Sequence, residues 1–267
     1  MRKISLFLLA ALLVAAPAFA ESVTGRGRYV SRDVNNLPAF HAVEVRGDIE
    51  VDFMQDKITS VTVSGRENLV ALSDVRVENG VLVVSFTRPV RVRGEYELRV
   101  AVRAPELTAV TASQSGEFDL RGSLDANQLT LTTDADSDIS MDYVNADTIT
   151  VAAYDRSDIE LGRVHVQQVK ATADGRADVD LSGMAEEAVL TNNGSGEIDA
   201  DGLRAVTVRA TANASGKIKV NAGEALYAQA NGRGRIEYRG YPSTLRKEGN
   251  ARKVVRDRDE DYDDYDD

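Results

Sequence analysis

The 267-residue chain has no cysteine, no tryptophan and only two histidines, and aromatic residues make up 6% of it. The lack of cysteine excludes disulfide bonds and thiolate sites, so stability must come from packing and backbone hydrogen bonds. With His41 and His165 as the only imidazoles, a histidine-based metal or nucleophile site is not expected. A Gly-x-Ser-x-Gly nucleophile motif and a phosphate-binding loop are also missing. The sequence therefore favours a protein that is not an enzyme.

The chain also lacks an apolar run of the roughly 20 residues that a membrane span needs. Its first residues instead follow the order of an export signal: Arg2 and Lys3, an apolar stretch over residues 4–14, and then Ala18-Phe19-Ala20. This pattern predicts a signal peptide over residues 1–20, cleaved between Ala20 and Glu21. We therefore expect a periplasmic, secreted or cell-surface protein with no transmembrane segment in the mature chain.

The formal net charge of −11 is concentrated at the C-terminus, where residues 256–267 hold eight acids and two arginines. A short basic stretch with Arg246, Lys247, Arg252 and Lys253 precedes it. Such a run of charge buries little apolar surface, so residues 244–267 are predicted to be a disordered tail, first basic and then acidic. An acidic chain with scattered bases is a poor nucleic-acid binder, and we expect no nucleic-acid partner.

The most informative feature is a repeat of about 20 residues in the second half of the chain. Its central apolar residue returns every 18 to 21 positions, as Phe118, Ile139, Ile159, Val179, Ile198, Ile218 and Ile236. A second apolar residue follows two positions later, as Leu120, Met141, Leu161, Leu181, Ala200, Val220 and Tyr238. The polar residue between them gives the period of two that is typical of a strand with one buried face. Regular repetition of this length indicates stacked coils.

Each repeat offers two further apolar stretches to the same interior. One lies eight to ten residues upstream of the central residue, as in Leu129 and Leu131 or Ile149 and Val151. The other lies about five residues downstream, at Leu124, Val144, Val164, Met184 and Leu203. The sequence thus predicts an all-β fold: a right-handed parallel β-helix (solenoid) of about seven coils over residues 107–243. Residues 21–106 show longer alternating runs, and we expect an all-β region that caps the open end of the solenoid.

Two columns mark the corner between the first two strands of each repeat. The first is rich in Asn and Asp and holds Ser113, Asp134, Tyr154, Asp174, Asn193, Asn213 and Asn231. Asn and Asp tolerate left-handed backbone, so that conformation is expected there. Three residues later come Gly116, Gly196, Gly216 and Gly234, where a tight bend is expected.

These motifs together resemble one known family. The Ser-Gly-x-Ile repeats, the closing Gly234-Arg235-Ile236-Glu237-Tyr238-Arg239-Gly240-Tyr241-Pro242 and the opening Gly25-x-Gly27 with Arg32, Phe40 and Val43-x-Val45 are similar to the head GIN domain family, over roughly residues 25–243. That family is named for the heads of auto-transporter adhesins and has no assigned activity. The resemblance implies a β-helical fold and adhesion to a surface ligand, protein or polysaccharide. The repeat departs from the family at Asp136-Ser137, Arg156-Ser157 and Arg176-Ala177, which replace Ser-Gly.

The candidate site is the outward column of acidic residues beside the central apolar one. Stacked carboxylates about 5 Å apart repel one another unless solvent, raised pKa values or a cation relieve them. Asp138, Asp158, Asp178 and Glu197 are therefore the candidate Ca²⁺ ligands, and no other cofactor is expected. The simpler interpretation, which we favour, is a solvated strand face that keeps the rod soluble. The change to Lys217 and Lys219 further along suggests ordinary charge compensation.

Two functions of different class follow. The first is an exported, non-enzymatic β-solenoid that binds a ligand of unknown identity in the envelope or at the surface. The alternative is a β-helical carbohydrate-active enzyme that uses surface carboxylates such as Asp158 and Asp178. No catalytic or cofactor-binding residue is assigned under the first function.

Overall fold

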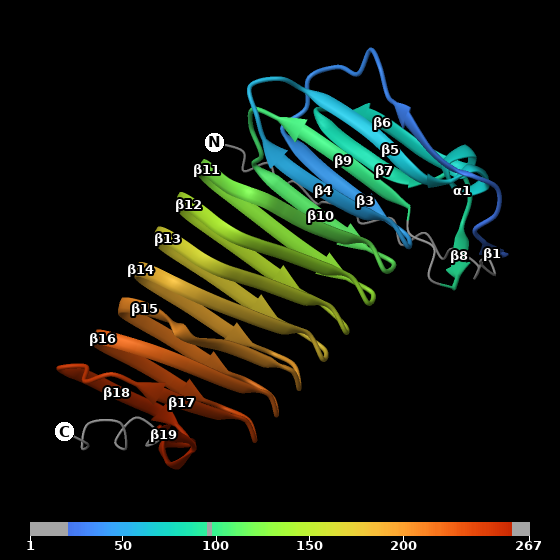
Figure 1. The fold of residues 1–267 in the computed structure, drawn as a ribbon. Coiled ribbons are helices and arrows are strands. Elements are labelled where there is room, and N and C mark those ends of the chain that lie inside the picture. Colours follow the sequence, from blue (N-terminus) through green and yellow to red (C-terminus); the bar gives the residue numbers. More distant parts are fainter. Residues whose placement is uncertain (1–20, 95–97, 258–267) are drawn as a thin grey trace, which may run out of the picture.

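The computed structural model describes residues 21–94 and 98–257; 70% of the structure is β-strand and 4% is helix (Figure 1). Seventeen strands form one continuous sheet, and β1 (Glu21–Thr24) and β8 (Val90–Arg93) form a separate pair. The predicted signal peptide and residues 258–267 of the predicted tail lie outside the described residues. Within the described part of the chain, no helix has the length and apolar character needed to cross a membrane.

The body of the molecule is a stack of long, bent strands, each of which makes most of one coil (Figure 1). Each pairs in parallel and in register with the next, so that Ile139 lies beside Ile159 and Ile159 beside Val179. These strands are β11 (Glu117–Asp134), β12 (Asp138–Ala153), β13 (Asp158–Ala173), β14 (Asp178–Asn192), β15 (Glu197–Ala212) and β16 (Lys217–Ala230). The shorter β10 (Ala109–Ser113) precedes them and β17 (Arg235–Arg239) follows. The predicted β-solenoid of about seven coils is confirmed.

The interior is filled by the apolar columns that the repeat predicts. The central column from Phe118 to Ile236 and the upstream pairs such as Leu129 and Leu131 are almost completely buried. Full burial of one such side chain contributes about 1.5–3 kcal/mol. Because a coil buries its apolar face only against its neighbours, stability passes from coil to coil along the rod.

The prediction that Met184 faces the interior is wrong. Met184 is 57% exposed, because Gly183 pairs with the buried Val164 and moves Met184 outward, opposite His165. A Cβ at Gly183 would lie 2.2 Å from the backbone oxygen of Val164, so the coil narrows there around a glycine. A one-residue shift in register reverses the side on which every following side chain lies.

The N-terminal half continues the same stack. β3 (Ala42–Arg46) pairs in parallel with β10, and β4 (Glu50–Gln55) pairs in parallel with the start of β11. β7 (Val81–Phe86) and β9 (Arg99–Ala104) add a further layer on β3 and β4. The sheet therefore crosses the predicted boundary at residues 106/107 without a break.

The stack ends on the N-terminal side in antiparallel strands. β5 (Ser60–Arg66) pairs with β9, β2 (Tyr29–Asp33) with β5, and β6 (Ser73–Glu78) with β7. The short helix α1 (Glu67–Leu72) lies between β5 and β6 and buries Leu69 and Val70 in the core. These elements contribute Val61, Val63, Leu69 and Val70 to the buried core, and a capping role for residues 21–106 stays a prediction.

The C-terminal stretch corrects the prediction of a disordered tail from residue 244. β18 (Thr244–Gly249) pairs in parallel with β16, and β19 (Val254–Arg256) pairs in parallel with β17. The 3₁₀ turn η1 (Ala251–Lys253) joins them. Charge suggested disorder, but Val254 is buried against the last coil, and β16 supplies strand partners for Arg246 and Lys247.

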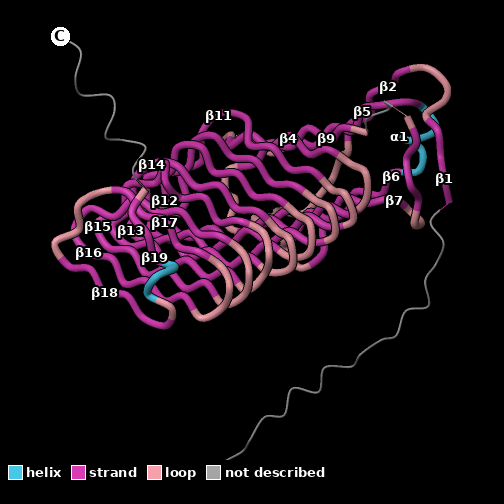
Figure 2. The backbone as a smooth tube through the Cα atoms, turned by 90° about the horizontal axis from the view of Figure 1, so that it is seen from below, coloured by secondary structure: helices cyan, strands magenta, loops and turns pink. Residues whose placement is uncertain are grey.

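The turns between coils lie in a row along one side of the rod (Figure 2). Gly196, Gly216 and Gly234, where a tight bend is expected, do not have positive φ. They are needed because the corners stack closely: a Cβ on Gly196 would lie 2.1 Å from the backbone oxygen of Ala177. Left-handed backbone occurs instead just after the column rich in Asn and Asp, which we call the Asx column. The residues are Gln114, Ser115, Ala135, Asp136 and Asp155.

The Asx column has a different part in the turns. Its amides bond from coil to coil: Asn213 donates to Asn193 over 2.8 Å, and Asn231 donates to Asn213 over 2.7 Å. Expected left-handed backbone is absent from all seven of these positions, each of which the structure describes.

Candidate functional site

The carboxylates of the predicted column lie on one flat face of the solenoid, on the first residues of the long strands. Parallel pairing places Asp138 beside Asp158 and Asp158 beside Asp178, while Asp180 lies beside Asp199. The structure extends the set to β4, whose Glu50 and Asp52 pair with Glu117 and Asp119. We call these residues the acidic column: Glu50, Asp52, Glu117, Asp119, Asp138, Asp158, Glu160, Asp178, Asp180, Glu197 and Asp199.

Arginines neutralise the N-terminal end of the acidic column. Arg121 Nε lies 2.5 Å from Asp52 Oδ1, and Arg99 Nη2 lies 2.7 Å from Glu50 Oε2. The hydrogen bond that Arg121 donates to Asp52 outweighs burial and raises the pKa of Arg121. Among the described residues, Glu50, Asp52 and Asp119 are the one group of three whose carboxylate oxygens lie within 4.8 Å of one another. Because two guanidinium groups already bond to this group, it is an ion-pair cluster.

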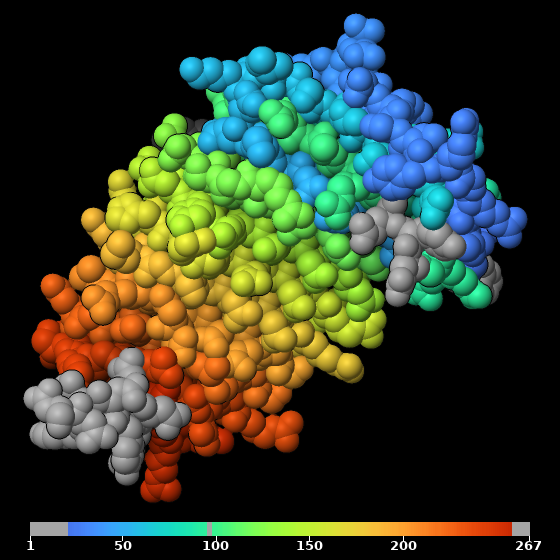
Figure 3. Space-filling view, viewed as in Figure 1, coloured from blue at the N-terminus to red at the C-terminus, as the bar shows by residue number. Residues whose placement is uncertain are grey.

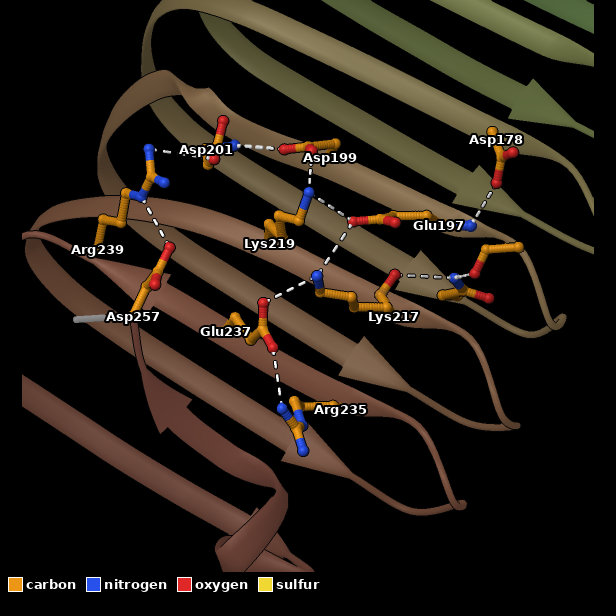
Figure 4. A network of polar contacts seen from close by, with 12 residues as sticks. Asp178, Glu197, Asp199, Asp201, Lys217, Lys219, Arg235, Glu237, Arg239 and Asp257 are labelled. Carbon is orange, nitrogen blue, oxygen red and sulfur yellow. Dashed lines mark hydrogen bonds and ion pairs between the residues drawn. The ribbon is translucent and has the colours of Figure 1, made fainter. Parts of the chain in front are cut away.

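Lysines neutralise the other end (Figure 4). Lys219 bonds to Asp199 and lies 2.9 Å from Glu197 Oε1, and its contacts with these two carboxylates raise the pKa of Lys219. Burial alone would raise the pKa of Asp199, but hydrogen bonds from Lys219 and the backbone of Asp201 outweigh it and lower that pKa. Lys217 reaches over to Glu237, 2.9 Å away. The network confirms the charge compensation that the sequence suggested at Lys217 and Lys219.

The middle of the acidic column is different. Asp138, Asp158, Glu160, Asp178 and Asp180 make no ion pair within the described chain. Burial, and then the charge of the neighbouring carboxylates, raises the pKa of Asp138, Asp158 and Asp180.

The backbone N–H of Glu197 donates to Asp178 over 2.6 Å, so part of the negative charge is met by the strand itself. The four candidate Ca²⁺ ligands share one face but do not belong to a described group of three carboxylates within 4.8 Å. Calcium binding by them remains a prediction, and the solvated face stays the simpler interpretation.

A second feature was not found from the sequence. A hollow of 830 Å³ opens beside the first coil, around Gln55, Thr108, Asp125, Gln128, Asn145 and Asp147. A further hollow of 350 Å³ adjoins it along the rod and shares Asn145, Ala146 and Asp147 with it. We call the two together the polar notch. His165 is exposed on the wall of the second hollow.

The polar notch exists because one coil is incomplete. Most coils have a middle strand segment, such as Ser123–Ala126 in β11, which pairs with Tyr143 to Ala146. The preceding coil runs from β9 to β10 through residues 105–108 alone and has no such segment. The segment in β11 therefore has no strand on its N-terminal side, and the space remains open.

Gln55 closes the end of the notch. Its amide Nε2 donates to the backbone oxygens of Pro105 and Asp125, each over 3.0 Å, and its Oε1 accepts from the backbone N–H of Asp125 over 2.9 Å. The side chain thus bonds to Asp125 as a neighbouring strand would. Neither repeat nor motif marks Gln55, so only the pairing of β4 with β11 reveals its role.

Comparison with known proteins gives one family and several similar folds. The sequence model of the family described as "Putative auto-transporter adhesin, head GIN domain" matches residues 39–242. No curated protein matches the chain.

The solved structures share the fold at low identity. A crystal structure of a "putative lipid binding protein" from Parabacteroides distasonis has a TM-score of 0.81 at 19% identity, with 88% of this chain and 99% of that one covered. A "putative adhesin" from Parabacteroides merdae has a TM-score of 0.79 at 20% identity, with 89% and 99% covered. Another adhesin so described, from Bacteroides fragilis, has 0.64 at 23% identity, with 88% and 98% covered.

Proposed function

Because the chain belongs to the head GIN domain family, we propose that it is an exported, non-enzymatic binding protein of the adhesion type. In this proposal it acts in the cell envelope or at the surface, and the rod presents an extended face to a protein or polysaccharide. One observation carries it: a single sheet runs from β2 to β19 and repeats its outward side chains in register from coil to coil. Figure 3 shows the coils as successive colour bands across one face.

A repeating face suits a repeating ligand. Each coil adds the same kind of contact one strand spacing, about 4.8 Å, further along the rod. Individually weak contacts become strong together when several engage at once, as avidity requires. An enzyme has no need of such repetition, whereas an adhesion protein gains from each added coil.

The interior favours a polar ligand over a lipid. The name of one relative mentions lipid binding. In this chain the core columns are filled by buried side chains, and the open hollows of 830 Å³ and 520 Å³ are lined mainly by polar groups. An acyl chain would need an apolar cavity, and none of these hollows offers one.

The enzymatic alternative has less support from the acidic column. An acid–base pair works when its environment pushes the two pKa values apart. Here burial and then neighbouring carboxylates raise the pKa values of both Asp138 and Asp158. Asp178 accepts an ordinary hydrogen bond from a backbone N–H. The column therefore has the character of a charged surface.

The test is a binding and turnover assay with the chain that begins at Glu21. We expect saturable binding to the surface of the cells that produce it, and no release of sugars from a panel of polysaccharides with or without Ca²⁺. Turnover that Asp158→Asn abolishes would overturn the proposal in favour of the enzyme. Protease digestion of intact cells separates the two locations: a surface protein is cut without lysis, whereas a protein inside the envelope is cut only after it.

A further inference from the structure

The polar notch has the size and position of a binding site. At 830 Å³ its larger part lies within the roughly 300–1,000 Å³ of small-ligand sites. Its lining includes the buried Leu107 and Ala146, which belong to the core, and Ala126, which packs against the core. The wall formed by Gln55 is fixed by three hydrogen bonds to backbone. The hollow is therefore shaped before any ligand arrives.

Neutral polar groups dominate the lining. Four amides and three threonine hydroxyls stand against three carboxylates around the larger hollow. No lysine or arginine is among the described residues that line either hollow. An anionic ligand would find no counter-charge here, which argues against nucleic acids and sulfated or phosphorylated polymers.

The lining is rich in free acceptors. Asn145 Nδ2 donates to Asp125 Oδ1 over 3.1 Å, and Gln167 Nε2 donates to Asp147 Oδ1 over 3.2 Å. These bonds orient the side chains and leave Asn145 Oδ1 and the second oxygen of each aspartate without a partner among the described residues. Asn127 and Gln128 add amides that both donate and accept. Hydroxyl groups, which donate and accept at one atom, match such a surface.

A peptide strand fits less well. Along the notch the middle segments of β11, β12 and β13 already pair with one another. The one open edge, at Asp125, has its N–H and C=O bonded to Gln55. A peptide could not add to the sheet there, so only side-chain contacts remain.

From these observations we propose that the polar notch binds an uncharged, hydroxyl-rich glycan. The sugar hydroxyls bond to Asp125, Asn145 and Asp147, whose side chains are all exposed beside the hollow. The second hollow continues the site along the rod, so a chain of sugars occupies both. The inference rests on the proposed adhesion function and names the ligand class and the face that serve it.

The experiment measures binding of the chain from Glu21 to three neutral polymers (dextran, mannan and arabinoxylan), to heparin and to poly-lysine. We expect saturable binding to at least one neutral polymer and none to heparin. The double variant Asn145→Ala/Asp147→Ala, which removes two exposed side chains from both hollows, should weaken that binding by about tenfold or more. The matched control Asp158→Ala/Glu160→Ala, on the acidic column, should bind within about twofold of the native protein.

Three results would overturn the site: no binding to the neutral polymers, equal binding by both variants, or notch-dependent binding to poly-lysine in their place. Thermal unfolding of each variant shows that it is folded. The proposed function is judged separately. Cell-surface binding that survives the notch variant contradicts the notch alone, whereas native protein that binds neither cells nor any polymer contradicts adhesion itself.

Discussion

The Nζ of Lys247 donates a hydrogen bond to the backbone oxygen of Val254 over 2.9 Å, across the C-terminal end of the solenoid. Lys247 pairs with the buried Ala228 and so occupies an inward position of β18. Its ammonium group also lies 5.1 Å from the centre of the Tyr238 ring. An inward charge on an edge strand discourages a further strand from adding. Lys247 therefore terminates the stack.

Replacing Lys247 should allow the C-terminal end of the rod to associate with another copy of the protein. Lys247→Met keeps the length of the side chain and removes the charge, so we expect dimers or higher oligomers joined end to end. Light scattering after size-exclusion chromatography measures this. Arg252→Met, at an exposed position on η1, is the control and should remain in the native oligomeric state. Equal behaviour of the two variants would show that Lys247 has no terminating role.

The middle of the stack should depend on Ile159. This side chain is 1% exposed and packs between Ile139 and Val179. Ile159→Ala should lower the free energy of unfolding by about 2–5 kcal/mol, and Ile159→Asp should prevent folding of the central coils. Chemical denaturation provides the measurement. Glu160→Ala, on the exposed side of the same strand, should change stability by no more than about 0.5 kcal/mol.

The effect of replacing a glycine by alanine should depend on the room that the neighbouring coil leaves for a Cβ atom. An alanine usually stabilises a glycine position of ordinary φ by about 0.4–1 kcal/mol. At Gly196 the new Cβ would lie 2.1 Å from the oxygen of Ala177, so Gly196→Ala should destabilise by about 1–3 kcal/mol or more. At Gly223 the nearest atom is 3.4 Å away, and Gly223→Ala should be tolerated. A Tm for Gly196→Ala at or above the native value would refute close stacking of the corners.

Much of the solenoid could be predicted because the repeat is a local pattern. Phe118, Ile159 and Ile236 recur at nearly constant spacing, and a period of two fixes which side they face. The prediction is wrong where one residue is gained or lost, as at Gly183, since inserting or removing a residue changes the register without changing composition. It is also wrong at Val254, whose burial depends on a strand edge offered by residues far away in the chain.

The candidate site likewise has a part that the repeat predicts and a part that it does not. The middle of the acidic column follows from the repeat, so Asp138, Asp158 and Asp178 could be placed beside one another. Glu50 and Asp52 lie outside the repeat, and their place in the column depends on the pairing of β4 with β11. The polar notch results from an absent strand segment, which no motif in the sequence marks.

The acidic column should give a measurable dependence on pH. Folding raises the pKa of Asp138, Asp158 and Asp180 above the ordinary 3.8, so their ionisation opposes folding at neutral pH, and protonation relieves this as the pH falls through the raised values. Asp158→Asn should therefore stabilise the protein at pH 7, by less than about 1 kcal/mol because solvent screens exposed charges. The gain should vanish below pH 3.8, because Asp158 is then protonated in both the folded and the unfolded protein.

The same variant tests Ca²⁺ binding. If the acidic column is a solvated face, Ca²⁺ should leave the Tm of both proteins unchanged at matched ionic strength. A rise in Tm with Ca²⁺ that Asp158→Asn lacks would assign the column to cation binding instead.

Gln55 should contribute more to the free energy of unfolding than an ordinary polar side chain at the surface. Its amide supplies the only hydrogen bonds that the described structure gives to the backbone N–H and C=O of Asp125 on the open side of the notch. Gln55→Glu keeps the acceptor but turns a donor toward two carbonyl oxygens into a negative charge. We expect a loss of about 1–3 kcal/mol, together with faster hydrogen exchange at the Asp125 amide. Gln167→Glu, exposed and bonded to one side chain over 3.2 Å, is the control and should leave that amide protected. If the Asp125 amide stays equally protected in both variants, the strand edge is held by something other than Gln55, and the notch does not owe its fixed wall to that side chain.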